Sequence, residues 1–266
     1  MATLPTSSRD QHRTSLGGST LDEARRRIIF PLDYPSLEQA RAAAEKIAPS
    51  VGGLKIGLEL FVREGPRAVQ IGRDLGLDIF LDLKLHDIPE TVGRAVAAAA
   101  ALKVRYLTVH AAGGAAMLSR AAQVASQSEG LLLLAVTVLT SLDEEDLRAQ
   151  GIPGGLEAHA RRMTELARAS GIPGVVASPV EVAGLRGAFG RDVLLVTPGI
   201  RPGPRDGRRS TDDQKRVSTP SEAIASGADL LVIGRPIRDA QDPLSAARAI
   251  VNEVARTLSA TSSHGK

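Results

Sequence analysis

Acidic and basic side chains alternate along residues 80–91, which read FLDLKLHDIPET. Asp82 and Lys84 are two positions apart, and because successive side chains of a strand point to opposite faces, the two share a face if the segment is a strand. Asp87 follows them, and Lys55 ends the previous apolar segment. The four residues therefore predict a row of alternating charges, in the order Lys55, Asp82, Lys84, Asp87.

Such a row would keep its members ionised. Opposite unit charges about 4 Å apart attract by roughly 4 kcal/mol at an effective dielectric constant of about 20. An ammonium held in this way is a positioned general acid. An ion-pair network with a purely structural role would have the same pattern, so the charges alone leave both interpretations open.

Short apolar segments alternate with longer segments of helical periodicity through most of the chain. The short segments predict strands at 27–32, 53–56, 78–84, 106–109, 131–138, 174–177, 192–196 and 230–233. The longer ones predict helices near 36–48, 62–75, 89–102, 115–126, 155–169, 181–188, 220–225 and 243–258. Ser36 and Thr219 are expected N-caps, and Gly76, Gly171 and Gly227 stand where C-caps belong.

Eight alternating strand and helix segments predict an α/β protein, either a closed (β/α)₈ TIM barrel or an open doubly wound sheet. No glycine fingerprint of the open sheet follows the first strand, where the chain reads LDYP. Nearly every strand also ends in a polar residue, and only a barrel brings all these ends to one face. They are Asp33, Lys55, Asp82 with Lys84, His110, Thr140, Ser178, Thr197 and Arg235. We therefore expect a single barrel domain over 26–260, with disordered tails at 1–25 and 261–266.

A predicted anion site lies after the last two strands. Gly234 and Arg235 follow the eighth strand, and Gly199 and Arg201 follow the seventh. In a barrel these loops are the usual phosphate site, with backbone N–H groups and an Arg as donors. Residues 201–217 are polar and rich in Gly, Pro, Arg and Asp, which predicts a lid over the phosphate, with Gln214 reaching the ligand, or an ordinary surface loop.

Composition limits the classes of function. There is no Cys, aromatic residues are 2% of the chain and the formal net charge is +3, which argues against disulfides, thiolate metal sites and base-stacking surfaces for nucleic acids. No apolar run is long enough to span a membrane, and the polar first residues resemble no secretory signal. We expect a cytoplasmic protein without a nucleic-acid or membrane partner, and we see no His and carboxylate spacing that predicts a metal.

These motifs resemble those of the orotidine 5′-monophosphate decarboxylases, which carry out the last step of UMP synthesis. The spacing Asp82-x-Lys84-x-x-Asp87 belongs to a wider group of phosphate-binding barrels, and the flanking residues 86–91 (HDIPET) narrow the resemblance to the decarboxylases. Further motifs in order along 27–260 include residues 31–33 (PLD), 55–57 (KIG), 108–111 (TVHA), 136–141 (VTVLTS), 197–202 (TPGIRP), 213–217 (DQKRV) and 233–236 (IGRP).

The resemblance implies roles for individual residues. Lys84 would deliver a proton to C6 of the pyrimidine as CO₂ leaves, with Asp82 against the departing carboxylate. Asp87 would reach into the site of the partner subunit of a homodimer, and Asp33 and Lys55 would bind ribose hydroxyls. The other substrate-binding residues would be Ile88, Thr91, Thr140, Ser141, Pro198, Arg201, Gln214, Gly234 and Arg235, with Thr140 and Ser141 on the pyrimidine. No metal and no cofactor would be needed.

Two alternatives stay open at this point. Related barrels include sugar-phosphate decarboxylases and aldolases that use Mg²⁺, but these would have a metal-binding Glu where this chain has Lys55, and Glu59 follows four residues later. A non-catalytic barrel that only binds a phosphorylated ligand would not require an ammonium between two carboxylates.

His110 is expected to be a hydrogen-bonded support for the floor of the site and not an acid or base.

Overall fold

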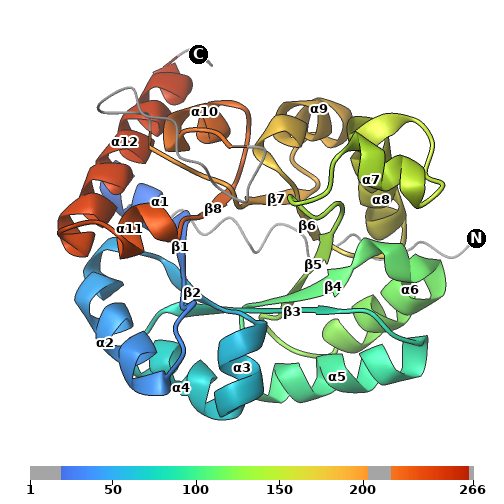
Figure 1. Ribbon diagram of the computed structural model, residues 1–266, viewed down its shortest axis with the longest axis horizontal. Coiled ribbons are helices and arrows are strands. Elements are labelled where there is room, and N and C mark those ends of the chain that lie inside the picture. The colour runs from blue at the N-terminus through green and yellow to red at the C-terminus, as the bar shows by residue number, and fades with distance from the viewer. Residues whose placement is uncertain (1–18, 203–216, 264–266) are drawn as a thin grey trace, which may run out of the picture.

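Eight parallel strands close into a barrel in the computed structural model, which describes residues 19–202 and 217–263 (Figure 1). The strands pair in chain order, and β1 closes the ring by pairing with β8 through Ile28 with Leu231 and Ile29 with Val232. The strands are β1 Ile28–Pro31, β2 Gly53–Ile56, β3 Asp78–Leu85, β4 Tyr106–His110, β5 Leu132–Val136, β6 Gly174–Val176, β7 Leu194–Thr197 and β8 Leu230–Val232. The predicted (β/α)₈ TIM barrel is confirmed.

The helices form a ring outside the barrel (Figure 1). They are α1 Thr20–Arg26, α2 Leu37–Ile47, α3 Leu58–Glu64, α4 Pro66–Asp74, α5 Pro89–Ala101, α6 Gly114–Ala125, α7 Glu144–Ala149, α8 Gly155–Ala169, α9 Pro179–Phe189, α10 Pro220–Ala225, α11 Arg235–Arg238 and α12 Pro243–Ser263. The predicted caps are present: the Ser36 and Thr219 side chains accept from backbone N–H groups of α2 and α10. Gly76, Gly171 and Gly227 have positive φ, a conformation that glycine adopts without steric cost.

Two apolar layers hold the barrel together. The larger lies between the strands and the helices, and the smaller contains Ile29, Phe80, Tyr106, Leu134, Val196, Leu230 and Val232, drawn from six strands. Ile29 belongs to the smaller layer, whereas its neighbours Ile28 and Phe30 belong to the larger one. This alternation is what strand side chains produce when one face lines the barrel interior.

The structure corrects both predicted tail boundaries. Residues 20–26 form helix α1 and not part of a disordered tail: Ser19 caps it and Ala24 is fully buried. The helix is so short that no apolar periodicity is visible in the sequence. At the other end α12 continues to Ser263, past the boundary expected at 260. The remaining tail residues, 1–18 and 264–266, lie outside the described residues.

A second correction concerns the helix predicted over 62–75. The structure has two helices there, because Gly65 adopts φ +54° and Pro66 follows it. Proline cannot continue a helix from the preceding turn, but it fits the first turn of a new one. The break lets α3 follow β2 directly, while α4 packs along β3.

Candidate active site

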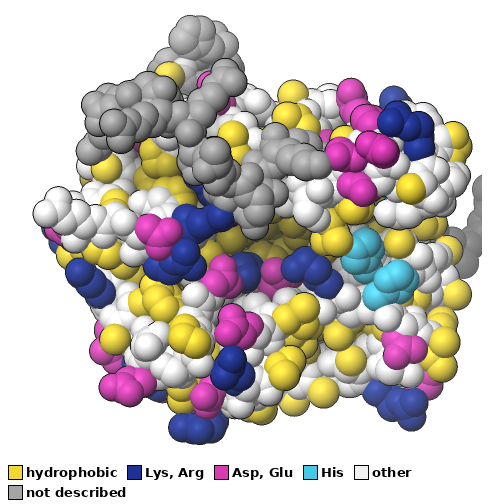
Figure 2. All heavy atoms as spheres, in the orientation of Figure 1, with side chains coloured by type: hydrophobic (Ala, Val, Ile, Leu, Met, Phe, Trp, Pro, Cys, Tyr) yellow, Lys and Arg dark blue, Asp and Glu magenta, His cyan; other side chains and the backbone are white. Residues whose placement is uncertain are grey.

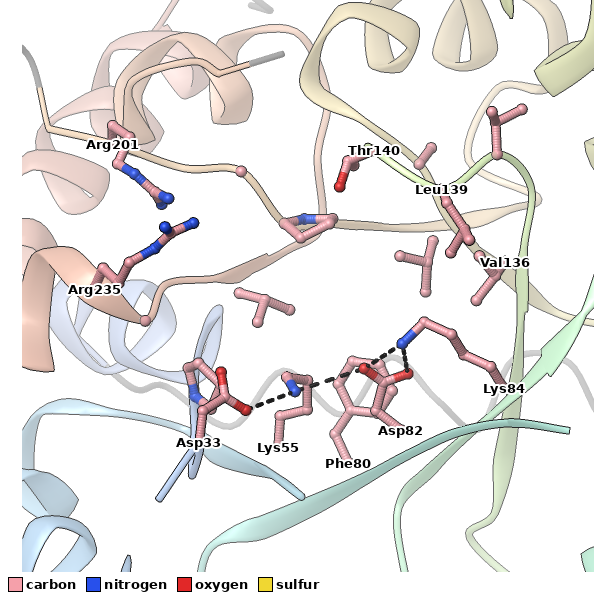
Figure 3. Close-up of a pocket in the computed structure, with 18 of the residues that line it drawn as sticks. Asp33, Lys55, Phe80, Asp82, Lys84, Val136, Leu139, Thr140, Arg201 and Arg235 are labelled. Atoms are coloured by element: carbon pink, nitrogen blue, oxygen red, sulfur yellow. Dashed lines mark hydrogen bonds and ion pairs between the residues drawn. The ribbon is translucent and has the colours of Figure 1, made fainter. Parts of the chain in front are cut away.

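Three members of the predicted charge row, Lys55, Asp82 and Lys84, lie together at the carboxyl ends of β2 and β3. The Lys55 Nζ atom of β2 is 3.3 Å from Asp33 Oδ1 and 3.6 Å from Asp82 Oδ2. The Lys84 Nζ atom of β3 donates to both carboxylate oxygens of Asp82, each at 2.9 Å. Figure 3 shows the four side chains in the order Asp33, Lys55, Asp82, Lys84 along one wall of a pocket. The alternation continues on the β1 side with Asp33, and not on the other side with Asp87.

Strand register brings these residues together. Pro31 of β1 pairs with Lys55, and Lys55 pairs with Phe80 of β3. Asp33 and Asp82 each lie two residues beyond those pairing partners, so their carboxylates flank the Lys55 ammonium. Neighbouring strands of a closed barrel therefore supply adjacent members of the row.

Lys84 departs from a regular strand. Its φ is +51°, which is uncommon for a residue with a side chain. Leu81 pairs with Leu107 of β4 and Leu85 pairs with Val109, so three residues of β3 (82–84) lie opposite the single residue Thr108. The expectation that Asp82 and Lys84 share a face is met, but through this bulge and not through simple alternation. Bulges of this kind re-aim side chains next to functional sites.

Thr108 connects the two catalytic candidates of β3. Its side chain is fully buried, and its Oγ1 atom accepts a hydrogen bond from the Lys84 backbone N–H at 2.8 Å. The same hydroxyl donates to Asp82 Oδ1 at 3.0 Å. The sequence places Thr108 in a motif without a role, because nothing in the residue types reveals a bond between neighbouring strands.

The surroundings of Asp82 determine its charge. Burial opposes ionisation, but the Lys55 and Lys84 charges and the hydrogen bonds from Lys84 and Thr108 outweigh it. The pKa of Asp82 is therefore below its usual value. Since the carboxylate stays ionised, it holds the Lys84 ammonium in place at neutral pH.

The row forms one wall of a pocket of about 470 Å³ at the open end of the barrel. Figure 2 shows acidic and basic side chains gathered around the hollow at the centre of this face. Phe80, Val176 and Val232 of the inner barrel layer lie at its floor. The other lining residues include Asp33, Lys55, Asp82, Lys84, Val136, Leu139, Thr140, Pro198, Arg201, Gly234, Arg235 and Arg238. This volume is within the range of small-molecule sites.

The pocket has a cationic end. Arg201 follows β7 and Arg235 begins α11 after β8, and Figure 3 shows both guanidinium groups at the side of the pocket beyond Asp33 and away from Lys84. Arg238 also lines the pocket, paired with the Asp239 carboxylate; the sequence gives no sign of it, because a short helix after β8 was not expected. The two ends differ in chemistry: guanidinium groups make one end positive, and the ammonium and carboxylate of β3 lie at the other end.

Several predicted site residues lie outside this pocket. Asp87 is exposed, with Oδ1 accepting from the Ile88 N–H at 2.6 Å, and the Ile88 side chain is also exposed. Thr91 and Ser141 are not among its lining residues either. Gln214 and most of the predicted lid lie outside the described residues.

His110 differs from the expectation of a hydrogen-bonded support. Its Nδ1 atom is buried without a hydrogen-bond partner among the described residues, and its ring stacks on that of His86 with centroids 5.3 Å apart. Burial, the neighbouring His86 and the charge of Lys84 lower the pKa of His110. The neutral form is therefore favoured, and His110 does not line the pocket.

Residues 19–202 and 217–263 lack the marks of two other classes of protein. No group of three or more His, Asp or Glu side chains within them is arranged to hold a metal ion. No helix within them combines the length and apolar character that crossing a bilayer requires.

Fold and site together define a (β/α)₈ barrel with a paired lysine and aspartate at one end of its pocket and arginines at the other. A sequence model of the orotidine 5′-phosphate decarboxylase / HUMPS family matches residues 26–250, and the chain belongs to this family. The orotidine 5′-phosphate decarboxylase of Anaeromyxobacter sp. (strain K) is 52% identical over 224 residues, which are 84% of this chain and 96% of that relative. That of Trichlorobacter lovleyi is 47% identical over 239 residues, 88% and 98% of the two chains.

A solved structure has the same fold. The crystal structure of orotidine 5′-phosphate decarboxylase from Lactobacillus acidophilus superposes with a TM-score of 0.74 at 36% sequence identity, over 85% of this chain and 98% of that one. The resemblance inferred from the motifs is thereby confirmed at the level of family and fold.

The lowered pKa of Asp82 predicts a pH dependence of stability. A carboxylate whose pKa is lowered by folding adds stability above its unfolded pKa of about 3.9, and this stability is lost as pH falls through the lower folded pKa. The unfolding free energy of Asp82→Asn should therefore fall less steeply below about pH 4 than that of the wild type. Urea unfolding between neutral and acid pH measures both curves, and parallel acid limbs would contradict the prediction.

Proposed function

We propose that this protein decarboxylates orotidine 5′-phosphate to UMP, with the Lys84 ammonium as the proton donor to C6 of the pyrimidine. The observation that carries the proposal is the contact of Lys84 Nζ with both oxygens of Asp82, 2.9 Å away, in a pocket whose other end is cationic. The family and the identities of the relatives support the reaction. The roles of individual residues are likewise proposed.

The reaction needs a fixed positive charge. When the bond between C6 and the carboxylate breaks, CO₂ leaves and the electron pair stays on C6 in the plane of the ring, where no adjacent π-system accepts it. Stabilisation must then come from groups already in place. An ammonium beside C6 stabilises the developing negative charge and then transfers its proton to that carbon, so that UMP forms and Lys84 is left neutral.

Asp82 has two tasks in this proposal. It orients the Lys84 ammonium, and it faces the carboxylate of the substrate, from which it is repelled until CO₂ departs. Its position between two ammonium groups, Lys55 and Lys84, supports both tasks, because they keep it ionised despite its burial. A neutral group in this place would hold neither lysine.

Binding energy away from C6 positions the ring. Arg201 and Arg235 would bind the phosphate, in the loops where barrels of this kind hold one. Asp33 and Lys55 would bind ribose hydroxyls, since both lie between the cationic end and Lys84 (Figure 3). The other proposed substrate contacts are Ile88, Thr91, Thr140, Ser141, Pro198, Gln214 and Gly234, with Thr140 and Ser141 on the pyrimidine. Phosphate binding contributes to rate when it places the reacting carbon against the ammonium.

We further propose a homodimer in which Asp87 acts in the partner's site. Asp87 and Ile88 are exposed and do not line the pocket of their own chain. Ile88 is 65% exposed, a large apolar side chain beside a carboxylate at the end of β3. Both features suit a surface covered by a second copy. The cytoplasmic location and the absence of a nucleic-acid or membrane partner stay predictions.

Neither alternative is favoured by an observation. A Mg²⁺-dependent sugar-phosphate enzyme would need a carboxylate where Lys55 stands. Glu59 does not supply it, because it lies on α3, does not line the pocket and pairs with Arg63 at 3.5 Å. A barrel that only binds its ligand would not explain the Lys84 and Asp82 pair.

Turnover in a chelator tests the proposed reaction. Purified protein in EDTA should convert orotidine 5′-phosphate to UMP. The loss of absorbance as UMP forms measures the rate. Lys84→Ala should lower kcat by about 10²-fold or more, since a positioned general acid contributes about 10²–10⁴-fold. Lys46→Ala, which removes an exposed lysine of α2, should keep wild-type kcat.

Three outcomes would contradict it. A folded wild-type protein without turnover would remove the proposed reaction. Activity that returns only with Mg²⁺ on a sugar phosphate would support the metal-dependent alternative. Equal losses in Lys84→Ala and Lys46→Ala would remove the special role of Lys84.

Mixing two inactive variants tests whether Asp87 acts in the partner's site. Lys84→Ala and Asp87→Ala are each expected to be nearly inactive. In a mixed two-fold dimer, one site would combine an intact Lys84 with an intact Asp87 of the partner, so random mixing should restore about a quarter of wild-type activity. If Asp87 acts within its own chain, no mixed dimer has an intact site, and activity stays at the level of the separate variants.

A further inference from the structure

We propose that Thr108 is a positioning residue for the reaction: its buried hydroxyl holds the backbone of Lys84 and the carboxylate of Asp82 in one fixed arrangement. This rests on the proposed function, in which Lys84 and Asp82 act together at C6. Thr108 does not line the pocket, so it would act through these two residues and not on the substrate.

The direction of both hydrogen bonds is determined by their partners. The Lys84 backbone N–H can only donate, so the Thr108 oxygen must accept from it, at 2.8 Å. The ionised Asp82 carboxylate can only accept, so the Thr108 hydroxyl must donate its one proton to Oδ1, at 3.0 Å. A single hydroxyl satisfies both bonds at once. No other side chain of that size supplies this combination except Ser.

The hydroxyl replaces a missing ladder bond. Because Thr108 alone lies opposite the three residues 82–84 of β3, the regular pairing of β3 with β4 is interrupted at Lys84. Lys84 is also at φ +51°, which its neighbours must hold. The Thr108 hydroxyl supplies the acceptor for the Lys84 N–H at this interruption, and so it contributes to the backbone position from which the Lys84 side chain starts.

The same hydroxyl fixes the rotation of the Asp82 carboxylate. Oδ1 accepts from Thr108, and Oδ2 lies 3.6 Å from Lys55 Nζ. The Lys84 ammonium bridges both oxygens. With its two oxygens held from opposite sides, the carboxylate presents one edge to Lys84, and the ammonium has one position relative to the pocket.

Loss of the hydroxyl should therefore affect chemistry more than binding. The charged groups stay in the pocket, so the substrate still binds, but the ammonium is no longer held at one place. A misplacement of about 1 Å lowers the rate of an oriented reaction by about 10²-fold. Thr108 also helps to lower the pKa of Asp82, so its loss should raise that pKa and move the acid limb of the kcat/KM profile to higher pH.

Three variants distinguish this positioning role from the structural contribution that any buried hydroxyl of the barrel would make. Thr108→Val has nearly the same shape and loses both hydrogen bonds, and Thr108→Ser keeps a hydroxyl. The control is Thr137→Val: Thr137 is also buried, and its hydroxyl donates its one proton to the Val176 carbonyl at 3.1 Å and not to Asp82. Each protein is checked for fold by circular dichroism and for its thermal midpoint.

Thr108→Val should lose about 10²-fold in kcat with little change in KM, and its acid limb should move to higher pH. Thr108→Ser should recover most of the rate, and Thr137→Val should keep wild-type kcat and pH profile. Wild-type kcat in Thr108→Val would overturn the inference. So would a loss that Thr137→Val shares, or one that Thr108→Ser does not reduce.

A measurement without substrate distinguishes this inference from the proposed function. In protein labelled with ¹³C at the Asp side chains, NMR titration reports the pKa of Asp82 directly. It should rise in Thr108→Val and stay at the wild-type value in Thr137→Val. If the wild type fails to turn over orotidine 5′-phosphate, the proposed reaction is wrong, and this titration still decides whether Thr108 controls Asp82: an unchanged pKa in Thr108→Val would overturn the inference.

Discussion

The contact between the Lys84 ammonium and the Asp82 carboxylate is the interaction on which the rest of the site depends. Both side chains are largely removed from water, with 32% and 13% of their surfaces exposed, and an unpaired charge in such a place is costly. Asp82 is kept ionised by both Lys84 and a second ammonium, Lys55, which is itself held by Asp33. Each of the two carboxylates, Asp33 and Asp82, therefore has an ammonium beside it. The hydrogen bonds to Asp82 determine the position of the Lys84 ammonium in the pocket.

The closed barrel is what makes this arrangement possible. Parallel strands in chain order place the ends of β1, β2 and β3 side by side, so residues more than twenty positions apart become neighbours. The same closure brings the loops after β7 and β8 next to β1, and with them Arg201 and Arg235. A ligand that reaches from the arginines to Lys84 thus crosses the mouth of the barrel (Figure 3). Phe80 and Val232 below it give the pocket an apolar floor.

Sequence patterns predict this architecture well where local periodicity is strong. The apolar segments define the strands, and the charges at positions 55, 82 and 84 identify the charged wall of the pocket. The bulge at Lys84 could not be predicted, because register depends on how β3 pairs with β4 and not on β3 alone. For the same reason the hydroxyl of Thr108 went unassigned. Asp87 and Ile88 lie outside the pocket of their own chain, so the roles proposed for them require a second chain, which residue types do not reveal. Helix α1 is too short for its periodicity to be recognised.

The proposed mechanism requires the Lys84 ammonium to lie at C6 of a pyrimidine nucleotide whose phosphate lies between Arg201 and Arg235. A crystal structure with a UMP analogue that carries an oxyanion on C6 tests it most directly, because the oxyanion imitates the charge that forms when CO₂ leaves. We predict that Lys84 Nζ lies about 2.8 Å from that oxyanion, as in other charge-assisted hydrogen bonds, with the phosphate on the two arginines. An analogue bound with C6 turned away from Lys84, or with its phosphate elsewhere, would contradict the account.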